Sequence, residues 1–320
     1  MWICQPWKNY SGYIRSVVIG DGVTGIGKFV FSKCSVLEEI TIPKGVTYIG
    51  EGAFSDCPAL KKVNYDAESA DVSNPVYMYD RDPFDEDDNV FAVYSAFARS
   101  GDSETGFHIV FGNSVKKIPE YLITGCKNVT KITIGKSLQN FEYRATQGCS
   151  GLKEVEVDAD NPNFAARNGM LLSKDMTTLV RCLSTQSGHV VIPDSVKTID
   201  GGAFSGCKGL TTVTIPESVS SIGSRAFYGC ENVTEIYYNA RNVEDKQSNS
   251  GVFSQVGKKV DGGSCLIIGA GVQRIPAYLF AQEECCDPDG DWGFPYYYEV
   301  FPNISSVKML SGACSIGRGA

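Results

Sequence analysis

A single pattern limits what this chain can fold into: Val196 to Tyr238 contains one 23-residue motif written twice in tandem. Eight positions recur in both copies, and apolar residues or cysteine fill them, whereas mostly polar residues and glycine lie between. The recurring positions are Val196, Ile199, Ala203, Phe204, Cys207, Leu210, Val213 and Ile215 in the first copy, and Val219, Ile222, Ala226, Phe227, Cys230, Val233, Ile236 and Tyr238 in the second. Self-similarity at a fixed period of about 20 to 50 residues is typical of stacked repeats. The motif therefore predicts an elongated repeat architecture.

The same frame returns elsewhere and indicates the local structure. Two copies occupy residues 23–65, and each ends in a short alternating run such as Leu37-Glu-Glu-Ile-Thr-Ile42, which has the period of a half-buried strand. Pro43 breaks that strand, and pairs such as Ile49-Gly50 mark a second, shorter extended segment. Helical periodicity is absent. We therefore expect a mainly β chain with little helix, built from strand, turn and short-strand coils whose strands form a parallel sheet.

The repeats are interrupted, and we expect one solenoid over residues 1–320 in which plain repeats alternate with special segments. The expected segments are a lead-in (1–22), repeats (23–65, 112–157 and 184–238), two insertion modules that resemble each other (66–111 and 239–268), a hairpin repeat (158–183), and further repeats (269–320) that include an aromatic insert (283–300). Asn168-Gly169 between two apolar runs predicts a tight hairpin turn. Because Ala320 lies inside a repeat and end coils normally need a cap, we expect the chain to be part of a longer protein.

The 12 cysteines suggest a disulfide framework, but half of them share one frame position. These six are Cys34, Cys57, Cys126, Cys149, Cys207 and Cys230. Since free cysteine behaves as a small buried hydrophobe, we expect these six to be buried thiols. No Cys or His spacing indicates a zinc site. The state of the remaining residues stays open: Cys4, Cys182, Cys265, Cys285, Cys286 and Cys314.

Charge and hydropathy exclude several partner classes. A net charge of −8 argues against nucleic acid, whose phosphates need a basic protein surface. The sequence has no run of about 18 apolar residues, so we expect no membrane span. Met1 to Tyr10 lacks the basic and apolar regions of a signal peptide.

Outward strand positions are the main candidates for binding, because strands stacked about 4.8 Å apart align them in continuous rows. Row one is Ser16, Glu39, Lys62, His108, Lys131, Glu154, His189, Thr212 and Glu235. Row two is Val18, Thr41, Asn64, Val110, Thr133, Glu156, Val191, Thr214 and Tyr237. The candidate ligand contacts from these rows are Lys62, His108, Lys131, Glu154, His189 and Tyr237. Ordinary solvated strand residues are the alternative interpretation.

Two stretches outside the rows are further candidates. Residues 292–301 contain six aromatics, and because interface hot spots favour Trp and Tyr, Trp292 and Tyr297 are candidate contacts. A fold-back that buries these rings is the alternative. Asp287 to Asp291 alternates carboxylates as calcium loops do, but Tyr298 stands where such a loop needs glutamate, so a polar turn competes with a calcium site. The acidic stretch Asp80 to Asp88 is typical of a solvated loop, with a cation site as the alternative.

The motif Val-Thr-x-Ile-Gly-x-x-Ala-Phe-x-x-Cys-x-x-Leu-x-x-Val-x-Ile-Pro resembles the BspA-type leucine-rich repeat of bacterial, and some protozoan, cell-surface proteins. Asn161 to Leu179 resembles the hairpin variant of that repeat. The resemblance implies a curved, right-handed solenoid with a concave parallel sheet, secreted or surface-anchored, with roles in adhesion. One departure is that Gly45 and Ser218 replace the Asn or Cys of a standard leucine-rich repeat. The side-chain ladder that seals such solenoids is therefore weak or differently placed.

We expect a non-catalytic module that contacts an extracellular host or microbial protein, or a glycan, through the concave sheet and the inserts. No cofactor, metal ligand or catalytic residue is expected, and the module should be a monomer. A structural spacer is the main alternative. A third is a polysaccharide-active enzyme that uses Glu154 and Glu156 as paired carboxylates, although the chain has no Gly-x-Ser-x-Gly, phosphate-loop or HExxH motif.

Overall fold

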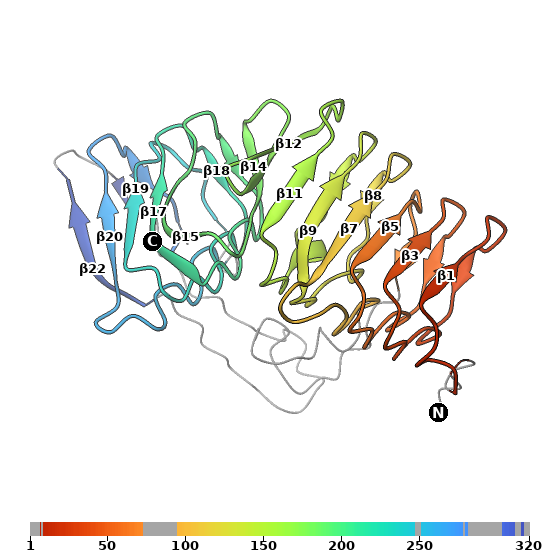
Figure 1. The fold of residues 1–320 in the computed structure, drawn as a ribbon. Coiled ribbons are helices and arrows are strands. Elements are labelled where there is room, and N and C mark those ends of the chain that lie inside the picture. Colours follow the sequence, from red (N-terminus) through yellow and green to blue (C-terminus); the bar gives the residue numbers. More distant parts are fainter. Residues whose placement is uncertain are drawn as a thin grey trace, which may run out of the picture. The chain divides into compact units, whose positions relative to one another are not determined.

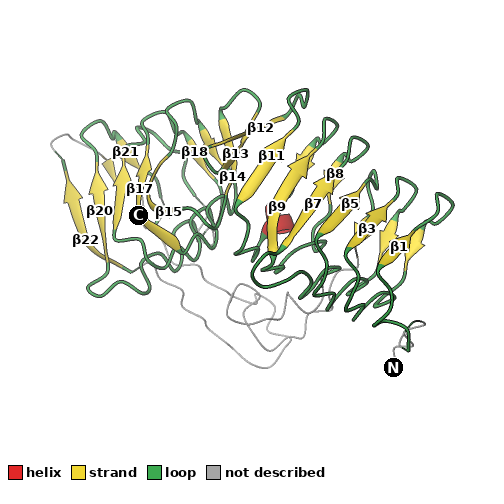
Figure 2. Cartoon of the chain, in the orientation of Figure 1, coloured by secondary structure: helices red, strands yellow, loops and turns green. Residues whose placement is uncertain are grey.

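The structure, a computed structural model, describes Trp7 and residues 9–72, 95–246, 251–277, 279–280, 303–310 and 315–316. The chain divides into two compact units, Met1–Lys174 and Asp175–Ala320. Their regular structure is almost entirely β (Figures 1 and 2). In each unit, strands from successive coils stack in parallel, so the mainly β solenoid with little helix is confirmed.

The main sheet of the first unit is a 6-stranded parallel sheet. In spatial order it contains β1 (Ser16–Val18), β3 (Glu39–Ile42), β5 (Lys62–Tyr65), β7 (Phe107–Phe111), β9 (Val129–Ile134) and β11 (Glu154–Val157). Its register follows the repeat, since Ser16 pairs with Glu39 and Lys131 with Glu154. Exposed and buried residues alternate along β3, which places one face of the sheet on the core and the other in solvent.

Short strands and a hairpin complete the first unit. The short strands are β2 (Gly25–Ile26), β4 (Tyr48–Ile49), β6 (Asp71–Val72), β8 (Lys117–Ile118) and β10 (Asn140–Phe141), and a 3₁₀ helix, η1, follows at Tyr143–Thr146. β12 (Phe164–Arg167) and β13 (Met170–Ser173) form the predicted antiparallel hairpin. At its turn Asn168 and Gly169 have φ angles of 51° and 71°. Both values are left-handed, as a type I′ turn requires, and asparagine and glycine adopt them most readily.

The second unit has the same plan. Its main sheet contains β15 (Ser187–Val191), β17 (Gly209–Ile215), β19 (Glu235–Tyr238), β20 (Ser264–Ile268) and β22 (Ile304–Met309). Its other strands are β14 (Thr178–Cys182), β16 (Thr198–Ile199), β18 (Ser221–Ile222), β21 (Arg274–Ile275) and β23 (Ser315–Ile316). The breaks in the sequence frame leave both main sheets continuous, because Lys62 pairs with His108 and Glu235 with Cys265.

Stacked phenylalanine rings occupy the core of each unit. In the second unit, successive ring centroids lie 4.8 Å apart along Phe204, Phe227, Phe253 and Phe280. In the first unit, Phe54 stacks on Phe31 at 5.6 Å and on Phe97 at 5.0 Å. Such ring pairs add about 0.5–1.5 kcal/mol each beyond the burial of their area. Phe97 and Phe253 belong to segments that interrupt the sequence frame, so these segments contribute coils to the stacks.

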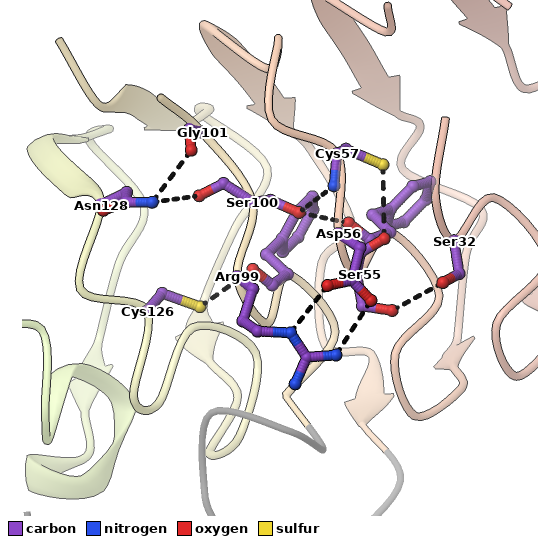
Figure 3. Close-up of polar contacts among 11 residues, drawn as sticks. Ser32, Ser55, Asp56, Cys57, Arg99, Ser100, Gly101, Cys126 and Asn128 are labelled. Carbon is purple, nitrogen blue, oxygen red and sulfur yellow. Dashed lines mark hydrogen bonds and ion pairs between the residues drawn. The ribbon is translucent and has the colours of Figure 1, made fainter. Parts of the chain in front are cut away.

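The six cysteines of the shared frame position are buried free thiols, as predicted. Five of them donate to a carbonyl oxygen of the preceding coil: Cys57 to Phe31 (3.3 Å), Cys126 to Phe97 (3.3 Å), Cys149 to Ile123 (3.1 Å), Cys207 to Leu183 (3.7 Å) and Cys230 to Phe204 (3.2 Å). Ser100 takes the cysteine position in its coil: its Oγ donates to Phe54 O and accepts from Cys57 N–H (Figure 3). The ladder of side chains that bonds one coil to the next is therefore placed differently from that of a standard leucine-rich repeat. In coils with a core phenylalanine it lies three residues after that phenylalanine.

The other cysteines divide into two groups. Cys182 is a buried free thiol and Cys265 is a half-buried one. Cys4, Cys285, Cys286 and Cys314 lie outside the described residues.

The first repeat is less buried than the frame predicts. Val23 is 39% exposed, and Val30 and Phe31 are half-buried, although their counterparts in later coils are buried. Among the described residues, a neighbouring coil covers them on one side only.

Candidate ligand-binding surface

Four candidate residues lie side by side on the solvent face of the first main sheet. The register pairs Lys62 on β5 with His108 on β7, His108 with Lys131 on β9, and Lys131 with Glu154 on β11. The predicted alignment of row one is therefore confirmed within this unit. A ligand role for the four residues stays a prediction.

Lys131 is the centre of a charged network on this face. Its Nζ lies 3.2 Å from Glu154 Oε1 and 2.7 Å from Glu156 Oε1. The hydrogen bond with Glu156 raises the pKa of Lys131, and the same contact holds the pKa of Glu156 below its usual value. Both groups are therefore charged at neutral pH. Because two carboxylates share one ammonium group, the network keeps a negative excess.

His108 joins this network through a threonine. Its Nε2 lies 2.9 Å from Thr133 Oγ1, and Thr133 Oγ1 in turn donates to Glu156 Oε2 at 3.2 Å. Burial lowers the pKa of His108, and the nearby charge of Lys131 lowers it further. At neutral pH His108 is therefore an uncharged hydrogen-bonding group on the surface of the sheet.

A second polar cluster surrounds Lys62 on the same face. Lys62 Nζ lies 3.7 Å from Glu39 Oε1, and Asn64 Nδ2 donates to the same oxygen at 2.8 Å and to Thr41 Oγ1 at 3.3 Å. Exposed ion pairs of this kind contribute little to folding stability. Their charges are accordingly accessible to a partner at small cost to the fold.

The second unit carries its own outward rows. His189 pairs with Thr212 on the neighbouring strand, and His189 Nε2 lies 2.9 Å from Thr214 Oγ1. Tyr237 pairs with Thr214, and its hydroxyl donates to Glu235 Oε2 at 3.2 Å, a bond that raises the pKa of Tyr237. The structure thus places His189 and Tyr237 on one face of the second main sheet, in rows one and two.

Several other candidates lie outside the described residues, namely Trp292, Tyr297, the stretch Asp287 to Asp291 and the stretch Asp80 to Asp88. In the part of the chain that the structure describes, no three His, Cys, Asp or Glu side chains are grouped as ligands of a metal ion. A search of the same residues finds no helix with the length and apolar character needed to cross a membrane.

A pocket that sequence reasoning missed lies at the carboxyl ends of β7, β9 and β11. Its volume is about 650 Å³. The strand ends and one hairpin residue line it: Val110, Phe111, Gly112, Asn113, Thr133, Ile134, Gly135, Val155, Glu156, Val157, Asp158 and Ala166. Thr133 and Glu156 also belong to row two, so the pocket adjoins the Lys131 network. The sequence offers no direct signal of it, because the glycines that follow two of these strands, Gly112 and Gly135, are explained by close packing of the coils: an added Cβ would overlap Asp66 at Gly112 and the Gly112 backbone at Gly135.

Comparison with known proteins places these features in a family. The profile of the BspA type leucine rich repeat region matches residues 8–81, 95–166 and 181–285 in 6 copies. A leucine-rich repeat protein from Eubacterium ventriosum ATCC 27560 has a similar crystal structure, with a TM-score of 0.53 and 20% identity over 95% of this chain and 75% of its own. A leucine rich cell surface protein from Faecalibacterium prausnitzii A2-165 gives a TM-score of 0.43 and 19% identity over 92% of this chain and 85% of its own.

No curated protein sequence matches the chain. At 20% identity the Eubacterium structure shares the fold with this chain, and its function does not carry over. The family profile is the stronger finding, because it covers well over half of the residues and coincides with the stacked coils. The chain therefore belongs to the BspA-type leucine-rich repeat family.

Proposed function

We propose that the chain is a non-catalytic, monomeric binding module that contacts another protein through the solvent faces of its main sheets. The alignment of Lys62, His108, Lys131 and Glu154 on four adjacent strands carries this proposal. Functional groups held on a regular sheet lose little conformational freedom when a partner binds, so a larger share of the contact energy appears as affinity.

An extracellular protein of host or microbial origin fits this surface best. The net charge of −8 disfavours nucleic acid, whereas mixed charges and hydrogen-bonding groups suit a protein surface. Membership of the BspA-type family supports a secreted or surface location, because the repeat resembles that of cell-surface proteins. A glycan is the second ligand class, favoured by the aromatic ring of Tyr237 on the second main sheet. Trp292 and Tyr297 remain candidate contacts.

A polysaccharide-cleaving role for Glu154 and Glu156 has less support. A glycosidase needs a general acid with a raised pKa, whereas the contact with Lys131 lowers the pKa of Glu156. One ammonium group also bridges both carboxylates. Incubation with a panel of plant and bacterial polysaccharides tests this alternative. Cleavage that is lost in Glu154→Gln would replace the binding proposal with an enzymatic one.

Binding of the labelled chain to arrays of extracellular-matrix proteins and of glycans tests the proposal. The double variant Lys62→Ala/Lys131→Ala removes both cations of row one, and Lys127→Ala removes an exposed lysine in a turn outside the sheet as the control. We expect at least one array protein to bind, with a signal about tenfold weaker in the double variant, in the range of an interface hot spot.

The two remaining outcomes distinguish the alternatives. Equal signals from the double variant and the Lys127→Ala control would remove row one from the proposed interface. A complete lack of binding on both arrays would favour a structural spacer, in which the repeats only project a neighbouring segment.

A further inference from the structure

We propose that the pocket at the carboxyl ends of β7, β9 and β11 anchors one basic side chain, lysine or arginine, of the partner protein. The inference rests on the binding role proposed above and names the chemistry that one part of the surface recognises. At about 650 Å³ the pocket falls within the range of about 300–1,000 Å³ that small-molecule sites occupy. It therefore has room for an entire arginine side chain.

Charge on the pocket wall has one sign. The ionisable lining residues are Glu156 and Asp158, and both are carboxylates. Lys131 contacts Glu156 from row one, but it shares its single charge with Glu154. Lys174 brings a second ammonium group, because its Nζ donates to the carbonyl oxygen of Ala159 beside Asp158. Three carboxylates against two ammonium groups still leave a negative excess, which an incoming cation would balance.

Oxygen acceptors remain available on both carboxylates. Glu156 Oε1 takes the contact from Lys131 and Oε2 accepts from the Thr133 hydroxyl, while an ionised carboxylate offers about four lone-pair sites. Asp158 Oδ1 accepts the N–H of Asp160 at 2.9 Å, which fixes the orientation of that carboxylate and leaves Oδ2 for a donor. A guanidinium group offers five donors and an ammonium group three, so either basic side chain matches this acceptor set.

The apolar part of the wall suits the stem of a basic side chain. Val110, Val155, Val157 and Ala166 line the pocket beside the two carboxylates. Lysine and arginine bury their methylene stems along apolar surface while the charged head stays at a polar site. Phe111 is fully buried, so none of the lining residues that the structure describes presents an aromatic face for a sugar ring. These features favour a basic side chain over a glycan.

The test uses three capped tripeptides that differ in the central side chain: Ac-Gly-Arg-Gly-NH₂, Ac-Gly-Lys-Gly-NH₂ and the uncharged citrulline analogue. Binding to the full chain is followed by methyl NMR at Val110, Ile134 and Ala166, which line the pocket. We expect the arginine or the lysine peptide to shift these methyl signals in a saturable manner. The citrulline peptide should bind about tenfold more weakly, because it lacks the charge-assisted bonds.

Two variants separate charge from shape. Glu156→Gln removes one carboxylate charge, and Ala166→Trp fills the pocket without changing its charge. Glu104→Gln is the matched control, because Glu104 is an exposed glutamate in a turn, outside both the pocket and the outward rows. We expect both pocket variants to weaken binding of the cationic peptide about tenfold, whereas Glu104→Gln should leave it unchanged. Thermal unfolding of each variant checks that it folds.

Three results would overturn the proposal: equal binding of the citrulline peptide, unchanged affinity in Glu156→Gln, or saturable binding of maltotriose at the same methyl groups without binding of either cationic peptide. The pocket proposal and the proposed function can each fail without the other. Failure of the peptides together with a loss of array binding in Lys62→Ala/Lys131→Ala would reject the pocket alone. Peptide binding without any effect of that double variant would reject the row-one interface alone.

Discussion

His108 on β7 and Thr133 on β9 are joined by a hydrogen bond of 2.9 Å, and His189 and Thr214 repeat this contact at 2.9 Å in the second unit. In the first unit, the other hydrogen bond of Thr133 shows which residue donates to which. Thr133 donates its hydroxyl hydrogen to the ionised Glu156, so the oxygen can only accept from His108 Nε2–H. The proton that His108 gains or loses on titration is therefore the one on Nδ1.

The pKa of His108 should lie below the usual histidine value of about 6.5, because burial and the charge of Lys131 both disfavour the imidazolium form. Between the lowered and the usual value the unfolded chain binds more protons than the folded chain, so stability rises with pH. The His108 contribution is complete above about pH 6.5 and is lost as pH falls through the lowered pKa. NMR titration of the imidazole ring and urea unfolding at several pH values measure both effects.

His108→Gln provides the comparison, because glutamine keeps a donor and does not titrate. We expect the unfolding free energy of the variant to fall less steeply between pH 7 and pH 5 than that of the parent chain. Carboxylates with lowered pKa, such as Glu156, contribute the same background to both proteins. Identical pH profiles, or a His108 pKa at or above the usual value, would contradict the assignment.

Phe227→Ala should lower the free energy of unfolding by about 3–5 kcal/mol, the usual range for removing a buried aromatic side chain. Phe227 is 1% exposed and lies between Phe204 and Phe253, each 4.8 Å away. The variant therefore loses two stacked contacts and leaves a cavity between coils. Lys127→Ala, in an exposed turn, should change stability by no more than about 0.5 kcal/mol. Equal shifts for the two variants in chemical unfolding would refute the core assignment.

Cys126 should resist alkylation by iodoacetamide in the folded protein. Burial raises the pKa of its thiol to about 12, although the contact with Ser95 opposes part of this effect, and the thiolate is the reactive form. Cys265 on β20 is half-buried and should be labelled in the folded state. Mass spectrometry of labelled peptides, with guanidinium-unfolded protein as the reference, measures both sites. Rapid labelling of Cys126 without unfolding would show that the ladder is open to solvent.

Much of the fold could be predicted because the fixed spacing of the repeat determines which residues pair between neighbouring strands. A position such as Phe227 identifies its equivalents at fixed offsets, and alternation along β3 or β5 identifies the outward rows. Phe97 could not be assigned to the core from the repeat pattern, and the reason is physical. The bond that each ladder cysteine makes can also be made by a hydroxyl, so Ser100 fills the cysteine position and hides the coil from a search for the motif.

The candidate site was less predictable than the fold. Row one follows from strand register alone, so Lys131 and Glu154 could be placed beside each other before the structure was known. The pocket depends on where three strands end and on the position of Ala166 in the hairpin. Gly135 does not indicate the pocket, because an added Cβ there would lie 2.7 Å from the backbone of Gly112 in the neighbouring coil.

Ser100→Ala should destabilise the first unit by about 1–3 kcal/mol, because it leaves buried backbone groups without their partner. Ser100 is 1% exposed, and its Oγ accepts from Cys57 N–H at 3.1 Å while donating to Phe54 O. Ser100→Cys should lose less stability, since Cys57 and Cys126 make the corresponding bond with a thiol in their own coils. Ser16→Ala, an exposed serine on β1, should stay within about 0.5 kcal/mol of the parent. Urea unfolding of the three variants gives this order directly. A cysteine variant as unstable as the alanine variant would mean that thiol and hydroxyl are not interchangeable in the ladder.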